Sequence, residues 1–295
     1  TPGILDSRAL PDRELSSHWD AVIVEPEQKD RLLSQAILSF TLRGKVDRAK
    51  LPLHGLIVLH GPPGTGKTSL ARGLASRAAE AVGHIGSFRY LEVEPHALTG
   101  AALGKSQRAV RDLLGQTVAE KAEHGPVVVL LDEVETLAAD RARLSMDANP
   151  IDVHRATDAV LAQLDQLAGR YPHLLFIATS NFTRAVDSAL LSRADLIENV
   201  GMPGPEACRM ILKSALEELA RAFPKAGRIA QDAEFERAAK HCIGLDGRQI
   251  RKLVISACAL KKQTAVDPNG LTAADLLEAA VQAQEEIKSR EEAKP

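Results

Sequence analysis

The segment that most constrains what this chain can fold into is a glycine-rich motif, Gly61-Pro62-Pro63-Gly64-Thr65-Gly66-Lys67-Thr68. It follows an apolar run at residues 55–60, which is typical of a buried strand, and it precedes a helical stretch that begins at Ser69. Glycines at these positions let successive backbone N–H groups turn inward around phosphate groups, and the N-terminus of the next helix adds its positive end. The Lys67 ammonium is suited to the β and γ phosphates, and the Thr68 hydroxyl is a ligand for Mg²⁺. We therefore expect a nucleotide phosphate site over residues 61–69.

Four short apolar runs predict buried parallel strands, at residues 56–60, 90–93, 127–131 and 174–179. Helical stretches separate them, and this alternation is typical of a parallel sheet with helices on both faces. After Val200 a segment rich in Gly and Pro interrupts the chain, and only helical periodicity follows it. The predicted fold class is α/β, with a large nucleotide-binding domain at residues 1–201 and a smaller all-α lid domain at residues 202–295. Within the first domain, residues 1–20 are polar and predict an irregular N-terminal segment.

Two of the predicted strands end in polar side chains. Asp132 and Glu133 follow the run at residues 127–131, and their side chains point in different directions because residues alternate along a strand. Asp132 can therefore hold Mg²⁺ through water, while Glu133 polarises the water that attacks the γ-phosphate. Asn181 ends the next strand and can orient that water, although an Asn at this point can also simply begin a turn. The pattern predicts hydrolysis, with Glu133, Lys67 and Asn181 in catalytic roles.

The net charge and the cysteines argue against several classes of protein. A formal net charge of −2 at pH 7 gives no basic bias toward nucleic acid or an anionic membrane. The cysteines Cys208, Cys242 and Cys258 are far apart and include no Cys-x-x-Cys pair, so we expect free thiols in a reducing compartment. No apolar run approaches the roughly 20 residues of a membrane span, and no signal sequence is visible at the N-terminus. We expect a cytoplasmic protein without a membrane partner.

Together these motifs resemble those of an AAA+ ATPase over nearly the whole chain, from about Trp19 to Ile287. Within that superfamily the chain resembles the pachytene-checkpoint ATPases (the thyroid-receptor-interactor remodellers), which unfold or reopen HORMA-domain proteins. The segments that carry this likeness are residues 59–70, 131–137, 159–167, 190–195 and 244–253. The tripeptide Arg193-Ala194-Asp195 is discriminating, because most remodelling ATPases have Phe between the arginine and the aspartate.

The resemblance implies roles for two arginines. Arg193 is similar to the arginine finger that reaches the γ-phosphate bound by the neighbouring subunit of a homohexamer, which couples hydrolysis to assembly. Arg248 resembles the sensor arginine of the lid, which contacts the nucleotide of its own subunit. The alternative is that both are surface arginines paired with Asp195 or Asp246.

The resemblance also implies an adenine contact and a pore loop. The segment that cups adenine in the family is matched here by Val22, Ile23 and Val24. The first pore loop falls within residues 96–108, where the relatives place an aromatic residue and this chain has none. The missing aromatic residue favours limited remodelling over processive unfolding, with Leu103 as the gripping side chain. The candidate pore-loop residues are Ala102, Leu103 and Gly104.

The activity implied by the resemblance is Mg²⁺-dependent ATP hydrolysis that disassembles or reopens a HORMA-domain partner. Only about twenty residues precede the AAA+ core, where eukaryotic relatives carry an adaptor-binding domain, so the chain is similar to the compact bacterial form. Those bacterial, CD-NTase-associated versions accompany a HORMA-domain protein and a cyclic-oligonucleotide synthase in anti-phage signalling. We expect the ATPase to restrain such a system.

Two other functions stay open. A nucleic-acid loader or translocase of the same superfamily is one, but the near-neutral charge and the lack of an aromatic stacking platform argue against nucleic acid as a partner. A non-hydrolysing, ATP-dependent scaffold is the other. It is opposed by the complete catalytic set, because a pseudoenzyme commonly lacks one member. The set comprises Lys67, Thr68, Asp132, Glu133 and Arg193.

Overall fold

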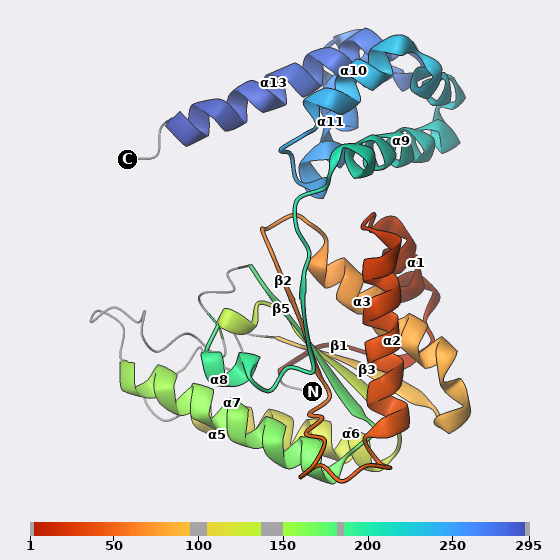
Figure 1. Cartoon of the computed structure of the whole chain (residues 1–295). Helices are drawn as coiled ribbons and strands as arrows, with labels where there is room; N and C mark the ends of the chain where they lie inside the picture. The colour runs from red at the N-terminus through yellow and green to blue at the C-terminus, as the bar shows by residue number, and fades with distance from the viewer. Residues whose placement is uncertain (1–2, 95–104, 137–149, 182–185, 293–295) are drawn as a thin grey trace. The chain divides into compact units, whose positions relative to one another are not determined.

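The computed structural model describes residues 3–94, 105–136, 150–181 and 186–292 (Figure 1). Contacts between residues divide the chain into two compact units. The first unit comprises Thr1–Gly61 and Lys67–Val200, and the second comprises Pro62–Gly66 and Gly201–Pro295.

The first unit is built on a six-stranded sheet whose spatial order is β1-β3-β4-β5-β2-β6. The strands, in chain order, are β1 (Ile4–Leu10), β2 (Leu56–His60), β3 (Phe88–Val93), β4 (Val127–Leu131), β5 (Leu174–Ser180) and β6 (Leu196–Asn199). All neighbours pair in parallel except β1, which runs antiparallel to β3. The predicted α/β fold class is confirmed, and the four predicted strands are present. The sequence does not predict β1 and β6.

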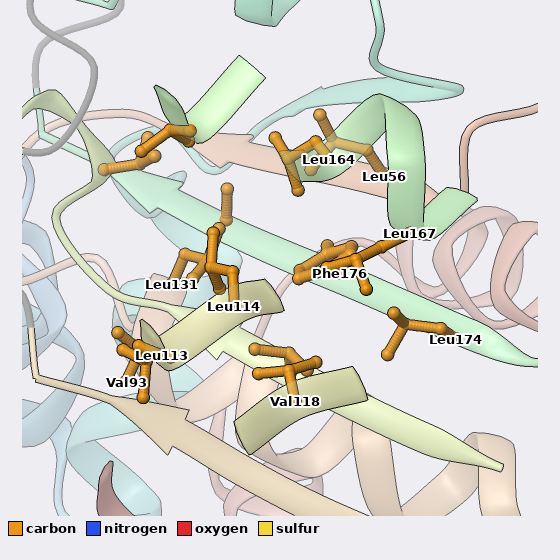
Figure 2. Packing of buried hydrophobic residues seen from close by; sticks show 14 of the residues in the cluster. Leu56, Val93, Leu113, Leu114, Val118, Leu131, Leu164, Leu167, Leu174 and Phe176 are labelled. Atoms are coloured by element: carbon orange, nitrogen blue, oxygen red, sulfur yellow. The ribbon is translucent and has the colours of Figure 1, made fainter. Parts of the chain in front are cut away.

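Alternation along the strands sends apolar side chains to two cores, one on each face of the sheet. In β2, Leu56 and Val58 belong to one buried cluster, while Ile57 and Leu59 belong to the other. Figure 2 shows the first cluster, in which leucine side chains from helices lie against Phe176 of the central strand β5. Both faces of the sheet are therefore covered, as a largely parallel sheet requires.

Helices cover the two faces of the sheet (Figure 1). The helices that contribute to the second cluster are α1 (Arg13–Ala21), α2 (Pro26–Leu42) and α3 (Lys67–Ala81). The other face is covered by α5 (Lys105–Val110), the π-helical segment η2 (Arg111–Val118), α6 (Ala119–Glu123) and α7 (Pro150–Arg170). Shorter segments of this unit are η1 (Gly83–Ile85), η3 (Val134–Thr136) and α8 (Ser188–Leu191).

The prediction that residues 1–20 are irregular is wrong. β1 joins the edge of the sheet by pairing with β3, and its alternating exposure turns Leu5 toward solvent. α1 follows it and is capped by Asp12, whose carboxylate accepts a backbone N–H of the first turn (2.9 Å). The buried Trp19 of α1 lies against Gly73 of α3. An edge strand and a one-sided helix need few apolar residues, so the sequence pattern is weak here.

The second unit is helical in its described residues. Its elements are α9 (Pro205–Ala222), η6 (Pro224–Gln231), α10 (Ala233–His241), α11 (Gly247–Ala259), α12 (Lys262–Val266), η7 (Pro268–Gly270) and α13 (Ala273–Glu292). Buried Phe235, Leu253 and Leu276 belong to its core. α11 begins with a capping box, in which the Asp246 carboxylate accepts the N–H of Gln249 and the Gln249 side chain accepts the N–H of Asp246 (both 2.8 Å). Among the described helices, none combines the length and the apolar character that crossing a membrane demands.

Candidate functional site

Three strand ends meet at the carboxyl edge of the sheet. β4, β5 and β2 are neighbours and run parallel, so they end on the same side. Gly61 follows β2, Asp132 follows β4 and Asn181 follows β5. Residues that are far apart in the sequence therefore arrive at one edge, which is where open parallel sheets bind their ligands.

The glycine-rich motif makes a turn in which a side chain is not tolerated at several positions. Gly61, Gly64 and Gly66 have φ angles of 149°, 81° and 94°. A Cβ at Gly61 would also overlap the carbonyl oxygen of Val200. Lys67 opens α3 and is 5% exposed. A buried lysine at a helix N-terminus, directly after a glycine turn, is suited to an anionic group.

Two threonine hydroxyls meet at one carboxylate oxygen. The Thr68 hydroxyl donates to Asp132 Oδ1 (2.8 Å), and the Thr179 hydroxyl donates to the same oxygen. Hydroxyl and carboxylate oxygens are the ligands that Mg²⁺ prefers, so Thr68 and Asp132 fit this ion. No group of three or more His, Cys, Asp or Glu side chains within the described residues could hold a metal by itself.

Glu133 leaves the strand in a left-handed conformation. Its φ is 51°, a region that costs a residue with a side chain about 1–2 kcal/mol. The backbone N–H of Glu133 donates to Thr179 Oγ1 (3.1 Å), and the Asn181 amide donates to Glu133 Oε1 (3.2 Å). The exposed Glu133 carboxylate is thus joined to Asn181, the other residue predicted to act on water. Thr179 connects the Asp132 carboxylate to the Glu133 backbone but is not predicted, although its place two residues before Asn181 is visible in the sequence.

Glu135 is a further acidic residue that the sequence does not single out. Its Oε1 accepts the backbone N–H of Asn181 (3.0 Å). Its Oε2 is buried and has no hydrogen-bond partner within the described residues. Glu135 therefore holds the backbone of Asn181, while Glu133 receives the side chain of the same residue. The only signal in the sequence is its position two residues after Glu133, and nothing ranks it above other acidic residues.

Arg193 is held by a carboxylate of its own chain. Its Nε and Nη2 donate to the two carboxylate oxygens of Asp165 (2.9 and 2.7 Å), and its Nη1 donates to Ala189 O (2.6 Å). The hydrogen bonds to Asp165 raise the pKa of Arg193 and lower the pKa of Asp165. The alternative pairing with Asp195 is wrong, because the Asp195 carboxylate accepts backbone N–H groups of residues 54–56. Asp165 is not predicted, since it lies 28 residues away and no motif links the pair.

Arg193 and the phosphate loop lie at opposite ends of β2. Arg193 precedes β6, and the N–H of Asp195 donates to the carbonyl of Leu56, the first residue of β2 (2.8 Å). The phosphate loop begins after His60, the last residue of β2. From Leu56 to His60 the strand rises about 13 Å, at about 3.3 Å per residue. The length of a strand therefore separates Arg193 from the phosphate loop of its own chain.

The roles of the remaining predicted residues, in the lid, at the adenine and in the pore loop, stay predictions. Arg248 is the second residue of α11 and is exposed. Val22 is buried at the end of α1, and Ile23 and Val24 are half-buried in the link to α2. The predicted pore-loop residues lie outside the described residues, and they are Ala102, Leu103 and Gly104.

A parallel sheet with this carboxyl edge defines a nucleotide-binding domain of the P-loop class. The sequence profile of the AAA family (ATPase family associated with various cellular activities) matches residues 57–202. CD-NTase-associated protein 6 of Pseudomonas aeruginosa is 58% identical over 283 residues, covering 96% of this chain and 93% of that protein. The chain belongs to the family of AAA ATPases that includes this Pseudomonas protein.

Two further similarities agree with this membership. The pachytene checkpoint protein 2 homolog of Oryza sativa subsp. indica is 33% identical over 315 residues, covering 95% of this chain but 65% of that protein. The predicted resemblance to pachytene-checkpoint and CD-NTase-associated ATPases is thus confirmed. A chain in the structure of the E. coli MS115-1 HORMA:CdnC:Trip13 complex has a TM-score of 0.74 at 18% identity, with 94% of each chain covered. At that identity the likeness concerns the fold alone.

Proposed function

We propose that this chain hydrolyses ATP with Mg²⁺ and uses the energy to disassemble or reopen a HORMA-domain protein. Membership of the AAA ATPases supports nucleotide hydrolysis. The Pseudomonas relative is a CD-NTase-associated protein, and a chain of similar fold occurs in a complex with HORMA and CdnC components. These associations favour a HORMA-domain substrate, alone or bound to a cyclic-oligonucleotide synthase, and a restraining role in anti-phage signalling.

The residues at the carboxyl edge divide the chemistry among them. Lys67 and the glycine turn bind and neutralise phosphate oxygens, while Thr68 and Asp132 hold Mg²⁺. When bound, the ion withdraws charge from the phosphoryl oxygens. Glu133 accepts a proton from the attacking water, and Asn181 orients both that water and the Glu133 carboxylate. In the same proposal the backbone of residues 22–24 contacts adenine.

One observation supports a site shared between copies of the chain: Arg193 lies a strand's length from its own phosphate loop. A side chain at that end of the sheet can serve a nucleotide only when a second copy presents its own carboxyl edge. Asp165 and Ala189 accept three of the five N–H groups of Arg193, so two others are available to an acceptor outside the described residues. We therefore propose a homohexamer in which each Arg193 completes the site of its neighbour.

Mixing two inactive variants tests the shared site. Glu133→Gln removes the base and Arg193→Ala removes the finger, and each protein alone should hydrolyse ATP at least about a hundredfold more slowly than the parent. Mixed assemblies should regain activity where an Arg193→Ala copy supplies the loop and a Glu133→Gln copy supplies the arginine. A mixture that assembles, binds nucleotide and stays inactive would contradict the shared site. Lys67→Ala mixed with Glu133→Gln is the control, because both changes damage the same edge and no interface of such a mixture is complete.

The substrate is tested with a candidate HORMA-domain protein bound to a fluorescent peptide. ATP should release the peptide with the parent protein and should not do so with Glu133→Gln. Stimulation of ATP turnover by single-stranded DNA, but not by the HORMA protein, would favour the loader function instead. Absence of phosphate release by the assembled parent would favour the scaffold function.

Two proposed contacts complete this mechanism. Arg248, in the lid, contacts the nucleotide of its own subunit, so Arg248→Ala should weaken turnover without blocking assembly. Leu103 grips the substrate, so Leu103→Ala should leave ATP turnover intact and slow peptide release. An unchanged rate of peptide release would remove Leu103 from the proposed grip.

A further inference from the structure

A hollow of about 250 Å³ lies at the amino edge of the sheet, at the end of the strands away from the phosphate loop. It is bordered by the segment after α2, the C-terminal end of α7 and the turn before β5. Nothing in the proposed hydrolysis uses these residues. Its walls include two arginines and several aliphatic side chains: Arg43, Arg48, Val46, Leu51, Leu53 and Pro172.

Arg43 brings a buried positive charge to this hollow. The residue is 8% exposed, its Nη1 donates to Leu174 O, and its Nη2 donates to Ala168 O (3.0 Å). Both acceptors are backbone carbonyls, and no carboxylate in the described residues is hydrogen-bonded to the guanidinium. Burial lowers the pKa of Arg43 to about 10, although the charge of Asp195 acts in the opposite direction. Buried charges in proteins are usually paired, so this cation is incompletely balanced by its own chain.

Glycines leave space for both guanidinium groups. Gly55 has a φ of 69°, and a Cβ there would overlap Arg43 Nη1. A Cβ at Gly169 would lie 3.1 Å from Nη1 of the half-buried Arg48. That nitrogen donates to Asp165 O (3.1 Å), whereas Arg48 Nη2 lies 3.8 Å from Asp165 Oδ1, too far for a hydrogen bond. Two arginines thus border the hollow, and neither makes a short contact with a carboxylate among the described residues.

The carboxylates close to these arginines are engaged elsewhere. Asp165 accepts two hydrogen bonds from Arg193, and Asp195 accepts backbone N–H groups before β2. Asp47, in the same segment as Arg48, is exposed and accepts the N–H of Ala49 (3.0 Å). The two guanidinium groups that border the hollow therefore make no short hydrogen bond to a carboxylate of the described residues and keep N–H groups to donate, so an anion is the class of ligand that they would bind.

The other walls of the hollow are aliphatic. They favour an organic carboxylate with an apolar group over inorganic phosphate, which has none. Leu51 is 53% exposed although it borders a concave site, so a ligand there would cover apolar surface. The volume lies below the roughly 300–1,000 Å³ of sites for drug-sized molecules, so the ligand is small. The planar guanidinium matches a carboxylate with two parallel hydrogen bonds.

We propose that this hollow binds a small organic carboxylate that carries an aliphatic group. The carboxylate lies between Arg43 and Arg48, and the aliphatic group covers Leu51 and Leu53. Two sources have this chemistry, a free short-chain acid and the C-terminal residue of a peptide. The site is independent of the proposed hydrolysis and of the nucleotide.

The test measures the binding of isovalerate and of N-acetyl-leucine to the full chain. Ligand-observed NMR detects the binding, with Mg-ATP present. Isovaleramide and N-acetyl-leucinamide have the same shape without the charge, and each should bind at least about tenfold more weakly than its acid. Binding of either acid supports the site, and the tighter of the two identifies the source. No binding of either acid, amides that bind as well as acids, or inorganic phosphate that displaces both acids at lower concentration would overturn the proposal.

Variants locate the binding. Arg48→Met keeps the aliphatic stem and should weaken the acids at least about tenfold. Lys50→Met is the matched control, because it removes a positive charge from the same segment at an exposed residue that does not border the hollow. Circular dichroism shows whether each variant folds. If Arg48→Met does not fold, Leu51→Glu takes its place, because it adds a charge at an exposed position that should repel the acids. Acids that bind equally well to the parent and to every folded variant would overturn the assignment to this hollow.

Discussion

Arg193 and Asp165 form a two-point ion pair, in which Nε and Nη2 of the arginine face the two oxygens of the carboxylate (2.9 and 2.7 Å). Such a contact fixes the plane of the guanidinium and not only its charge. The Arg193 side chain is 25% exposed, so solvent screens the pair only in part. Asp165 therefore orients the arginine that we propose to act on a neighbouring nucleotide, and it does so before any neighbour is present.

Replacement of Asp165 by Asn tests this orientation. The variant keeps the size of the side chain and one acceptor oxygen but loses the charge. We expect ATP turnover to fall about tenfold while the affinity for nucleotide changes less than about twofold, because only the geometry of Arg193 is disturbed. Steady-state kinetics with kcat and KM determined separately would measure both effects.

A matched control exists in a surface ion pair between α6 and α7. Glu123→Gln breaks the surface pair between Glu123 and Arg170 at the end of α7 (2.9 Å) and should leave turnover unchanged. If Asp165→Asn instead hydrolysed ATP faster than the parent, the pair would be a restraint on Arg193, and the orienting role would be wrong.

Thr179→Val tests the link that Thr179 makes between the Asp132 carboxylate and the Glu133 backbone. The Thr179 hydroxyl donates to Asp132 and accepts the Glu133 N–H, so its loss leaves a backbone donor unpaired at nearly constant side-chain volume. We expect kcat to fall about tenfold to a hundredfold and the free energy of unfolding to fall by about 1–2 kcal/mol. Turnover assays and urea unfolding measure these separately. Thr41→Val is the control, because it removes a hydroxyl that donates to Ile37 O on α2 and should not change kcat. If Thr179→Val had the same kcat as the parent protein, the proposed link would be wrong.

The sheet could largely be predicted from the sequence because its central strands are buried on both faces. All five residues of Val127–Leu131 are buried, so the strand is a continuous apolar run. β1 could not be predicted in this way. Its residues Asp6, Ser7 and Arg8 carry no apolar signal, and the strand is held by backbone pairing to β3, which does not depend on apolar side chains.

The candidate site is likewise predictable from the sequence only in part. Gly61, Asp132 and Asn181 are predictable because each stands at the end of a strand that the sequence reveals. The partners of these residues are not. Thr179 and Asp132 are 47 residues apart, and their hydrogen bond depends on the lateral register of β4 and β5. A single sequence contains strand ends but not the register that brings polar groups into contact.

Gly73→Ala tests the docking of the N-terminal helix. A Cβ at Gly73 of α3 would lie 2.5 Å from the Trp19 backbone nitrogen and 2.6 Å from Trp19 Cβ. Alanine favours a helix over glycine by about 1 kcal/mol, but overlap with backbone cannot be relieved by a change of rotamer. We expect the free energy of unfolding to fall by about 1–3 kcal/mol. Urea unfolding measures it, with the fluorescence of Trp19, the only tryptophan of the chain, as the signal. Gly83→Ala, with no neighbour within 4 Å, is the control, and a Gly73→Ala protein as stable as the parent would contradict the docking.

His60 makes stability depend on pH. It ends β2 directly before the phosphate loop, and its burial lowers its pKa, with the charge of Lys67 acting in the same direction and that of Glu198 opposing it. In the unfolded chain the imidazole titrates near 6.5, so below that pH the unfolded state binds the proton more readily than the folded state. The free energy of unfolding should therefore fall as the pH is lowered through about 6.5, and this group contributes no pH dependence well above it.

Urea unfolding between about pH 7.5 and pH 5.5 measures this effect. The decrease should be smaller in His60→Gln, which has nothing to titrate at this position. It should not vanish, because burial also lowers the pKa of His54 and gives a second contribution of the same sign. His84→Gln, which changes an exposed histidine of η1, should behave like the parent. Equal decreases in the parent and in His60→Gln would mean that burial beside the phosphate loop is not what makes this protein sensitive to acid.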